Sequence, residues 1–262
     1  MPSLVAPRYP APLRACSGIV VTAPSSGVEP HLHRRLDIVI AQLQALGFVV
    51  EEGDLAPGQD DPLTAGVMPA LALPAGSRFT QRQSTHWQKQ WTDFAQAHHT
   101  VHALTEPTRW WALDGTDAVH FQGRLLGGCL DTLMHLAGSM HGDVAGYIAR
   151  CHAAGDSVVL YLENAEQSPA ATLRALHRLR WSGWLDGLAG VLIGRSAAPD
   201  TTGAHALRWA DALRSTLGSL PCPVLVDVDI GHRPPQLLLV NGARAVVRWS
   251  TAAGSEVVQW LT

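Results

Sequence analysis

The stretch Val158-Val159-Leu160-Tyr161-Leu162-Glu163 decides the fold, because five apolar residues in a row end at a carboxylate. An apolar run of this length is typical of a strand buried in a parallel sheet. Ser168-Pro169 follows, and a serine N-cap before a proline is a favoured start for a helix. We expect this helix to face the core with the side chains of Leu173, Leu176, Leu179 and Trp181.

The same alternation continues towards the carboxyl terminus. Leu188 to Ile193 predicts a second strand, Ala204 to Leu217 a second helix that ends at Gly218, and Pro223 to Val228 a third strand. This β-α-β-α-β order indicates a parallel sheet. The tail from Ala243 to Leu261 alternates between apolar and polar residues, as edge strands do.

The amino-terminal part predicts another β-α-β unit. Gly18 to Thr22 is a short apolar strand, and five apolar residues between Leu32 and Leu46 recur at steps of four and three, so that they share one helical face. Gly47 suits the left-handed position after a helix, and Phe48 to Val50 starts a second strand. From Asp54 to Gly76 the chain is rich in proline and glycine, which predicts a loop longer than compact domains usually contain.

Composition excludes several classes of protein. Of 262 residues 47% are hydrophobic and 16% charged, which is enough apolar surface for a proper core. The net charge of -3 offers no basic field for nucleic acid or a membrane surface, and no apolar stretch is long enough to span a bilayer. Residues 1–17 lack the apolar core of a signal peptide. The cysteines have neither metal-site nor disulfide-framework spacing, so we expect a cytoplasmic protein.

A segment at residues 77–111 is rich in tryptophan: it holds Trp87, Trp91, Trp110 and Trp111. The indoles either pad the edge of a core or form an aromatic wall for a planar ligand. His98, His99 and His102 in the same segment include an i, i+4 pair, but they have no acidic or cysteine partner nearby, so we expect no metal. The organisation predicted is an incomplete amino-terminal domain at 1–75, a connecting segment at 76–114 and a carboxy-terminal domain at 115–262.

Glu163 and His232 are the candidate site residues. Glu163 ends one predicted strand, and His232 follows another strand inside the rigid sequence Gly231-His232-Arg233-Pro234-Pro235. Taken alone, the glutamate could be a solvated or capping residue and the histidine a structural one. Since ligands collect at the carboxyl ends of parallel strands, the two side chains can meet at one edge of the sheet, where a carboxylate orients an imidazole that acts as general base.

A nucleophile is missing from this arrangement. The chain has no Gly-x-Ser-x-Gly motif, and Cys129 after Gly127-Gly128 has the character of a buried small residue that starts a helix. The glycines from Gly123 to Gly128 resemble a phosphate-binding loop but lack the Lys-Ser/Thr pair.

Three stretches, at 160–166, 173–176 and 184–195, resemble the core of the LD-carboxypeptidase family, which includes the microcin-immunity peptidases. Further agreement comes from residues 21–26, 123–128, 231–235 and 241–243. The resemblance covers residues 17–55 and about 76–250, and it is specific in the second half. It implies a metal-free and cofactor-free serine hydrolase, usually a homodimer, with a Rossmann-like amino-terminal α/β domain and a swivelling carboxy-terminal β/α/β domain.

By motif, the resemblance makes Glu163 the acid and His232 the base. Implied substrates are the L,D-peptide bond of a murein tetrapeptide, or an amide that joins a peptide or acyl group to a nucleotide. The chain also departs from the family pattern. The family's Arg-Gly-Gly loop and Gly-Tyr-Ser-Asp turn, which carries the nucleophile, have no counterpart between Asp54 and Met68, and Cys129 stands where immunity-type members often carry asparagine.

This departure leaves three hypotheses open. The first is a serine peptidase by descent, whose activity then needs a displaced serine such as Ser25, Ser77 or Ser84. The second is a non-catalytic ligand-binding homologue. The third is a defective gene product. Loss of a nucleophile from such a triad costs about a millionfold in turnover. Loss of the block should also expose a sheet edge and apolar helix surface, which predicts lower stability and self-association.

Overall fold

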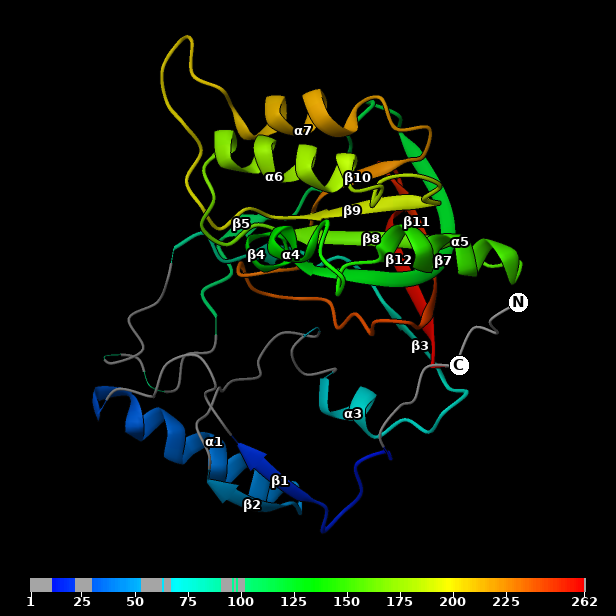
Figure 1. The fold of residues 1–262 in the computed structure, drawn as a ribbon. Coiled ribbons are helices and arrows are strands. Elements are labelled where there is room, and N and C mark those ends of the chain that lie inside the picture. The colour runs from blue at the N-terminus through cyan, green and yellow to red at the C-terminus, as the bar shows by residue number, and fades with distance from the viewer. Residues whose placement is uncertain are drawn as a thin grey trace.

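A mixed sheet of eight strands organises most of the chain (Figure 1). The computed structural model describes residues 11–21, 30–52, 63, 67–90, 96, 98 and 102–261. The strands lie in the order β3 (Arg78–Gln81), β12 (Gly254–Trp260), β11 (Arg244–Ser250), β7 (Ala118–Cys129), β8 (Val158–Glu163), β9 (Gly190–Gly194), β10 (Val224–Val228) and β6 (Trp111–Ala112).

Four strands of this sheet end at the same edge. β7, β8, β9 and β10 run parallel, and Cys129 at the end of β7 is paired in register with Glu163 at the end of β8. The first half of β7 pairs antiparallel with β11, so this long strand joins the antiparallel and parallel parts of the sheet. The predicted parallel core is confirmed, and its strands are apolar because both of their faces are covered.

Helices cover one face of the parallel strands (Figure 1). They are α4 (Leu130–Leu136), α5 (Val144–Ala153), α6 (Pro169–Trp181) and α7 (Trp209–Leu217). Leu176, Leu179 and Leu213 of these helices pack on Leu160 and Val191 of the sheet. A second buried cluster on the opposite face joins Phe121, Leu192 and Trp249 to Trp110. The parallel strands are therefore buried on both sides, which gives the site at their ends a rigid support.

The amino-terminal unit is small. β1 (Gly18–Val21) and β2 (Val49–Glu52) form a parallel two-stranded sheet, joined by the 3-10 turn Pro30–Leu32 and by α1 (His33–Ala45). This is the predicted β-α-β unit, and Gly47 has the left-handed backbone expected after α1 (φ 86°). A short helix, α3 (Val67–Leu71), and the paired strands β4 (His86–Trp87) and β5 (Glu106–Pro107) complete the described elements.

Three expectations from the sequence were wrong in detail. The tail strands β11 and β12 lie inside the sheet, since β3 covers β12, and the edges are β3 and β6. The predicted helix at 204–217 begins only at Trp209, because Gly203 has a left-handed backbone (φ 116°) and Asp200 accepts the Trp209 N–H. Trp181 is 81% exposed and stacks on His177, because it lies at the free end of α6.

Within the described part of the chain, none of the helices combines the length and the apolar character that crossing a bilayer requires.

Candidate functional site

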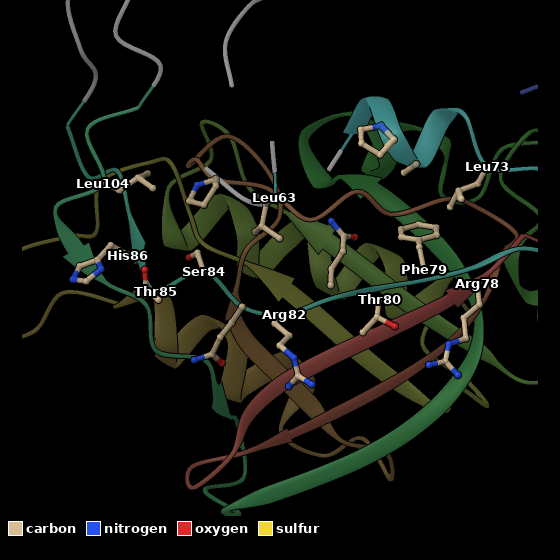
Figure 2. A pocket seen from close by; sticks show the side chains of 15 residues that line it. Leu63, Leu73, Arg78, Phe79, Thr80, Arg82, Ser84, Thr85, His86 and Leu104 are labelled. Carbon is tan, nitrogen blue, oxygen red and sulfur yellow. The ribbon is translucent and has the colours of Figure 1, made fainter. Parts of the chain in front are cut away.

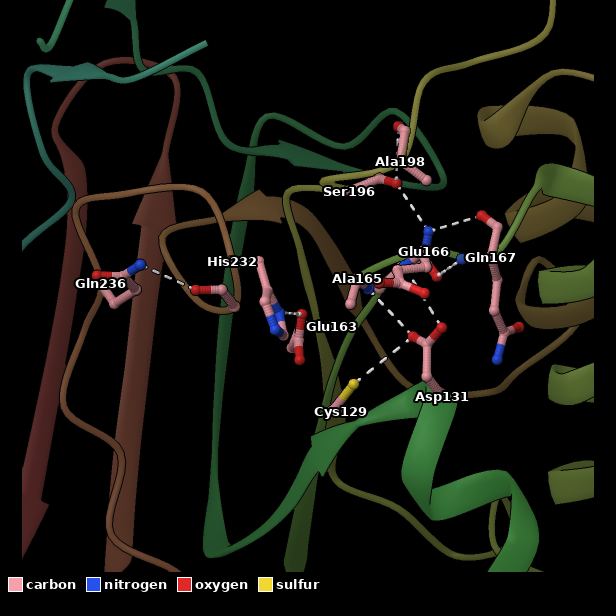
Figure 3. A network of polar contacts seen from close by, with 12 residues as sticks. Cys129, Asp131, Glu163, Ala165, Glu166, Gln167, Ser196, Ala198, His232 and Gln236 are labelled. Atoms are coloured by element: carbon pink, nitrogen blue, oxygen red, sulfur yellow. Dashed lines mark hydrogen bonds and ion pairs between the residues drawn. The ribbon is translucent and has the colours of Figure 1, made fainter. Parts of the chain in front are cut away.

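Glu163 and His232 meet at the carboxyl edge of the parallel strands (Figure 3). Nδ1 of His232 lies 2.9 Å from Oε2 of Glu163, although 69 positions separate the two residues. The glutamate side chain is 8% exposed and the imidazole 51% exposed. A carboxylate can only accept, so Nδ1 carries the proton and donates it to Glu163. The other ring nitrogen, Nε2, is left with a free lone pair, as a general base requires.

Gly231 sets how closely the histidine turn, residues 231–235, approaches Glu163. A Cβ at this position would lie 2.5 Å from Oε2 of Glu163, and its φ of 99° is one that side-chain-bearing residues rarely adopt. Gly194, at the end of β9, is equally tight, since its Cβ would lie 2.5 Å from the Ile230 carbonyl oxygen. Two glycines therefore let the turn pack directly on the acid.

A polar network holds the loop that follows Glu163 (Figure 3). Asp131, in the first turn of α4, accepts the backbone N–H groups of Ala165 at 3.1 Å and Glu166 at 3.4 Å. Asn164 is fully buried and donates to the Gln167 carbonyl at 2.9 Å and to Ser196 Oγ at 2.8 Å. These bonds connect the ends of β7, β8 and β9 and restrict the position of the acid.

Cys129 lies beside Glu163 and is not an activated nucleophile. Its thiol donates to Asp131 at 3.5 Å. Burial, followed by the hydrogen bond to Glu163 and the charge of Glu163, raises the pKa of the Cys129 thiol to about 11. A nucleophilic cysteine needs a lowered pKa, so the expectation of a small residue that starts a helix fits this position better.

Two of the three serines that could replace the family's nucleophile have recorded partners other than His232, and the third lies outside the described residues. Ser84 Oγ donates to Asp229 at 2.9 Å and shares a hydrogen bond with Thr108 at 2.6 Å. Ser77 precedes β3, and its carbonyl accepts the Leu261 N–H. Ser25 lies outside the described residues, as does most of the loop between Asp54 and Met68. Among the described side chains, the recorded partner of the His232 ring is Glu163 alone.

The tryptophan-rich segment has more than one role. Trp110 is 3% exposed and belongs to the second buried cluster, while Trp111 packs against the first. These two indoles fit the core-padding alternative. Trp87 lies under the Arg195 guanidinium, 5.0 Å from it, and lines a cavity of about 210 Å³ with Trp209 and Asp227. Trp91 and His99 lie outside the described residues, and the described residues contain no group of three metal-ligating side chains.

A larger cavity of about 590 Å³ lies between α3 and β3 (Figure 2). Leu63, Leu73 and Phe79 supply apolar walls, and Pro235 from the histidine turn joins the lining. Neither Glu163 nor His232 lines it.

Sequence reasoning missed a second ion pair at the same edge of the sheet. Arg195 and Asp229 directly follow β9 and β10 and form a buried bond of 2.6 Å. The argument that selected Glu163, a charged residue at the end of a parallel strand, applies equally to them. The sequence signal for both is the charged residue that directly follows each strand.

Comparison with known proteins gives a family match over residues 122–247, to the LD-carboxypeptidase C-terminal domain. A protein of Streptomyces coelicolor that is provisionally named a carboxypeptidase is 36% identical over 124 residues. That match spans 47% of this chain and 36% of the relative, so it covers about a third of the relative's length.

Solved structures of the microcin C7 self-immunity protein MccF have the same fold. The wild-type apo form matches with a TM-score of 0.74 and 15% identity, over 97% of this chain and 98% of that chain. An MccF-like protein from Bacillus anthracis gives a TM-score of 0.69 at 14% identity, over 96% and 98% of the two chains. One from Streptococcus pneumoniae, solved in complex with AMP, gives 0.64 at 17%, over 93% and 98%.

Proposed function

We propose that this chain, whose residues 122–247 match the LD-carboxypeptidase C-terminal domain, is an LD-carboxypeptidase-like serine peptidase in which Glu163 orients His232 as general base. The observation that carries the proposal is the 2.9 Å bond between His232 Nδ1 and the buried carboxylate of Glu163. This bond fixes the tautomer that leaves Nε2 able to take a proton.

The reaction that this pair serves is hydrolysis of an amide bond. Nε2 takes the proton of an attacking serine hydroxyl while its oxygen adds to the carbonyl carbon, and the imidazolium then protonates the departing amine. Water hydrolyses the resulting ester by the same sequence. Glu163 stays ionised throughout and stabilises the imidazolium. The hydrogen bond from Nδ1 to Oε2 holds the orientation of the ring.

The substrates proposed are small. They are an L,D-peptide bond at the end of a murein tetrapeptide, or an amide that joins a peptide or acyl group to a nucleotide. Support for the second class comes from MccF, which has been solved with aspartyl sulfamoyl adenosine and with glutamyl sulfamoyl guanosine. We also propose that the protein is a homodimer in the cytoplasm and that it has no nucleic acid or membrane partners.

A fluorophosphonate probe tests the catalytic role. Wild-type protein should be labelled on a serine, and His232→Gln should lose labelling by at least a hundredfold, because the serine then has no base. His135→Gln, which changes another histidine of the same domain, serves as the matched control and should label normally. Absence of labelling in the wild type contradicts hydrolysis.

A second candidate is a binding protein of the same family that hydrolyses nothing. It is favoured by one observation: the hydroxyl of Ser84, one of the serines that could replace the nucleophile, is held by Asp229 and Thr108. Such a protein should show a raised melting temperature with AMP, an aminoacyl sulfamoyl adenosine or a murein tetrapeptide, and no fluorophosphonate label. Labelling that depends on His232 would exclude it.

A further inference from the structure

Asp229 lies three residues before His232, and its carboxylate accepts hydrogen bonds from separate segments of the chain. Its carboxylate is fully buried. Oδ1 accepts from Arg195 at 2.6 Å and from the Ser84 hydroxyl at 2.9 Å, and Oδ2 accepts from the Ser84 N–H at 2.8 Å and from Trp110 Nε1 at 3.1 Å. Four donors satisfy this charge, and they come from the segments that follow β3 and β9 and that precede β6.

Arg195 is equally enclosed, with its side chain 5% exposed. It donates to the Asp227 carbonyl at 3.0 Å as well as to Asp229, and its guanidinium lies over the Trp87 ring. A buried ion pair adds little net stability over an apolar pair, but it is directional and fixes where its partners lie. The pair therefore fits a role in positioning better than a role in stability.

The backbone connects this pair to the histidine turn. The Asp229 carbonyl accepts the Leu237 N–H at 2.6 Å, which closes the loop that carries His232 at its base. Farther out on the loop, Gln88 donates to the Pro234 carbonyl at 2.8 Å, and Arg233 donates to the carbonyls of Lys89 and Ala197.

The tryptophan-rich segment therefore makes hydrogen bonds with two parts of the loop that carries His232. Ser84 and Trp110 hold Asp229 at the base, and residues 88 and 89 hold the outer part. The turn packs on Glu163 without room for a Cβ at residue 231, so the position of its base bears directly on the distance between His232 and the acid.

We propose that Asp229 is a positioning residue, which with Arg195 and Ser84 holds the histidine turn so that His232 Nδ1 stays bonded to Glu163. This inference rests on the proposed role of His232 as general base. Asp229 itself lies behind the turn and acts through it.

The test observes the hydrogen bond and not the reaction. In protein with 15N-labelled histidine, the Nδ1 proton of His232 is identified by its loss in His232→Gln. Asp229→Asn keeps the shape of the side chain but removes the charge that pairs with Arg195, and it should increase the exchange rate of this proton with water at least tenfold. Ser84→Ala removes one donor from Asp229, is expected to fold, and should give an increase of about threefold.

Leu213→Ala is the control for general destabilisation, because Leu213 is fully buried in α7, away from the turn. It should lower the melting temperature and leave the His232 signal unchanged. The proposal is overturned if both Asp229→Asn and Ser84→Ala fold and keep the wild-type exchange rate, or if Leu213→Ala changes that rate equally. Neither outcome depends on hydrolysis, so a wild type without fluorophosphonate labelling would refute the proposed function and leave this result standing.

Discussion

At the scale of single residues, the site is defined by which charges share one buried edge. Asp131, Glu163 and Asp229 lie at the ends of β7, β8 and β10 along this edge, and each carboxylate has its own donors. The Cys129 thiol lies between the first two and is kept protonated there. A thiol in this position therefore reports on the charge of Glu163.

Alkylation of Cys129 tests this arrangement. At pH 8 a thiol with a pKa of about 11 is about one part in a thousand thiolate, so iodoacetamide should modify Cys129 far more slowly than the exposed Cys16. Burial is the larger cause of the raised pKa and the charge of Glu163 the smaller. Glu163→Gln should thus lower the pKa and accelerate modification several-fold. Peptide mass spectrometry measures the rates, and Glu166→Gln, which changes an exposed neighbour, should leave them unchanged.

Asp227 predicts a pH dependence of stability. Burial raises the pKa of this carboxyl, although the Trp111 N–H and the charge of Arg195 oppose the rise. A folded pKa above the unfolded one gives stability that is fully present below the unfolded pKa and is lost as the pH rises through the folded pKa. Ionised Asp227 therefore weakens the fold at neutral pH.

The variant Asp227→Asn should be more stable than wild type to urea at pH 7, since it removes a buried charge and still accepts from Trp111. The left-handed backbone at this position (φ 58°) tolerates asparagine. The advantage should vanish near pH 3, where Asp227 is protonated in both states. An equal difference in urea midpoint at pH 3 and pH 7 would show that charge is not the cause.

At the scale of elements, helix starts and strand ends place the site. α6 begins at Pro169, and the Ser168 side chain accepts the Ala171 N–H at 3.3 Å. This helix packs on α4 and α7 and buries Leu176 and Leu179 on the sheet. Its first turn also follows the loop that leaves Glu163, so the start of α6 fixes one end of that loop.

Removal of this cap should cost about 1 kcal/mol of unfolding free energy, the usual value for loss of an N-cap side chain. Ser168→Ala makes the change, and urea denaturation followed by circular dichroism measures it. Ser182→Ala at the other end of α6 is the control, because there the backbone N–H and not the side chain makes the capping bonds. Equal losses in the two variants would refute a specific role for the N-cap.

The sequence predicts the central elements because their signals are local. An apolar run marks β8, and the Ser168-Pro169 pair marks α6. Glu163 ends β8 and His232 follows β10, and both strands run parallel to β9 between them, so the two side chains meet at one edge of the sheet. Two of the expectations that failed have different causes. β12 is covered by β3, which is far away in the sequence, and α7 starts late because of a local turn in which Asp200 accepts the Trp209 N–H.

At the scale of the whole molecule, the chain combines a large sheet, whose parallel strands are buried on both faces, with a small amino-terminal unit. In the described residues, β2 pairs with β1 alone, and a two-stranded sheet is marginal by itself. Leu46 and Val49 in this unit are 54% and 56% exposed, and Leu71 of α3 is 45% exposed. From this exposed apolar surface we predict that the amino-terminal part is weakly stable.

We therefore expect the molecule to unfold in two steps. Backbone amides of β1 and β2 should exchange with deuterium at least a hundredfold faster than those of β8, because opening the small sheet exposes little buried surface while β8 exchanges only when the core opens. Mass spectrometry of peptides measures both rates in one sample. Val159→Ala, which weakens the large sheet, is the matched variant: it should accelerate exchange in β8 and leave the rates in β1 and β2 unchanged. Equal protection of both sheets, lost together in a single sharp transition, would mean that the amino-terminal unit is a full part of the core.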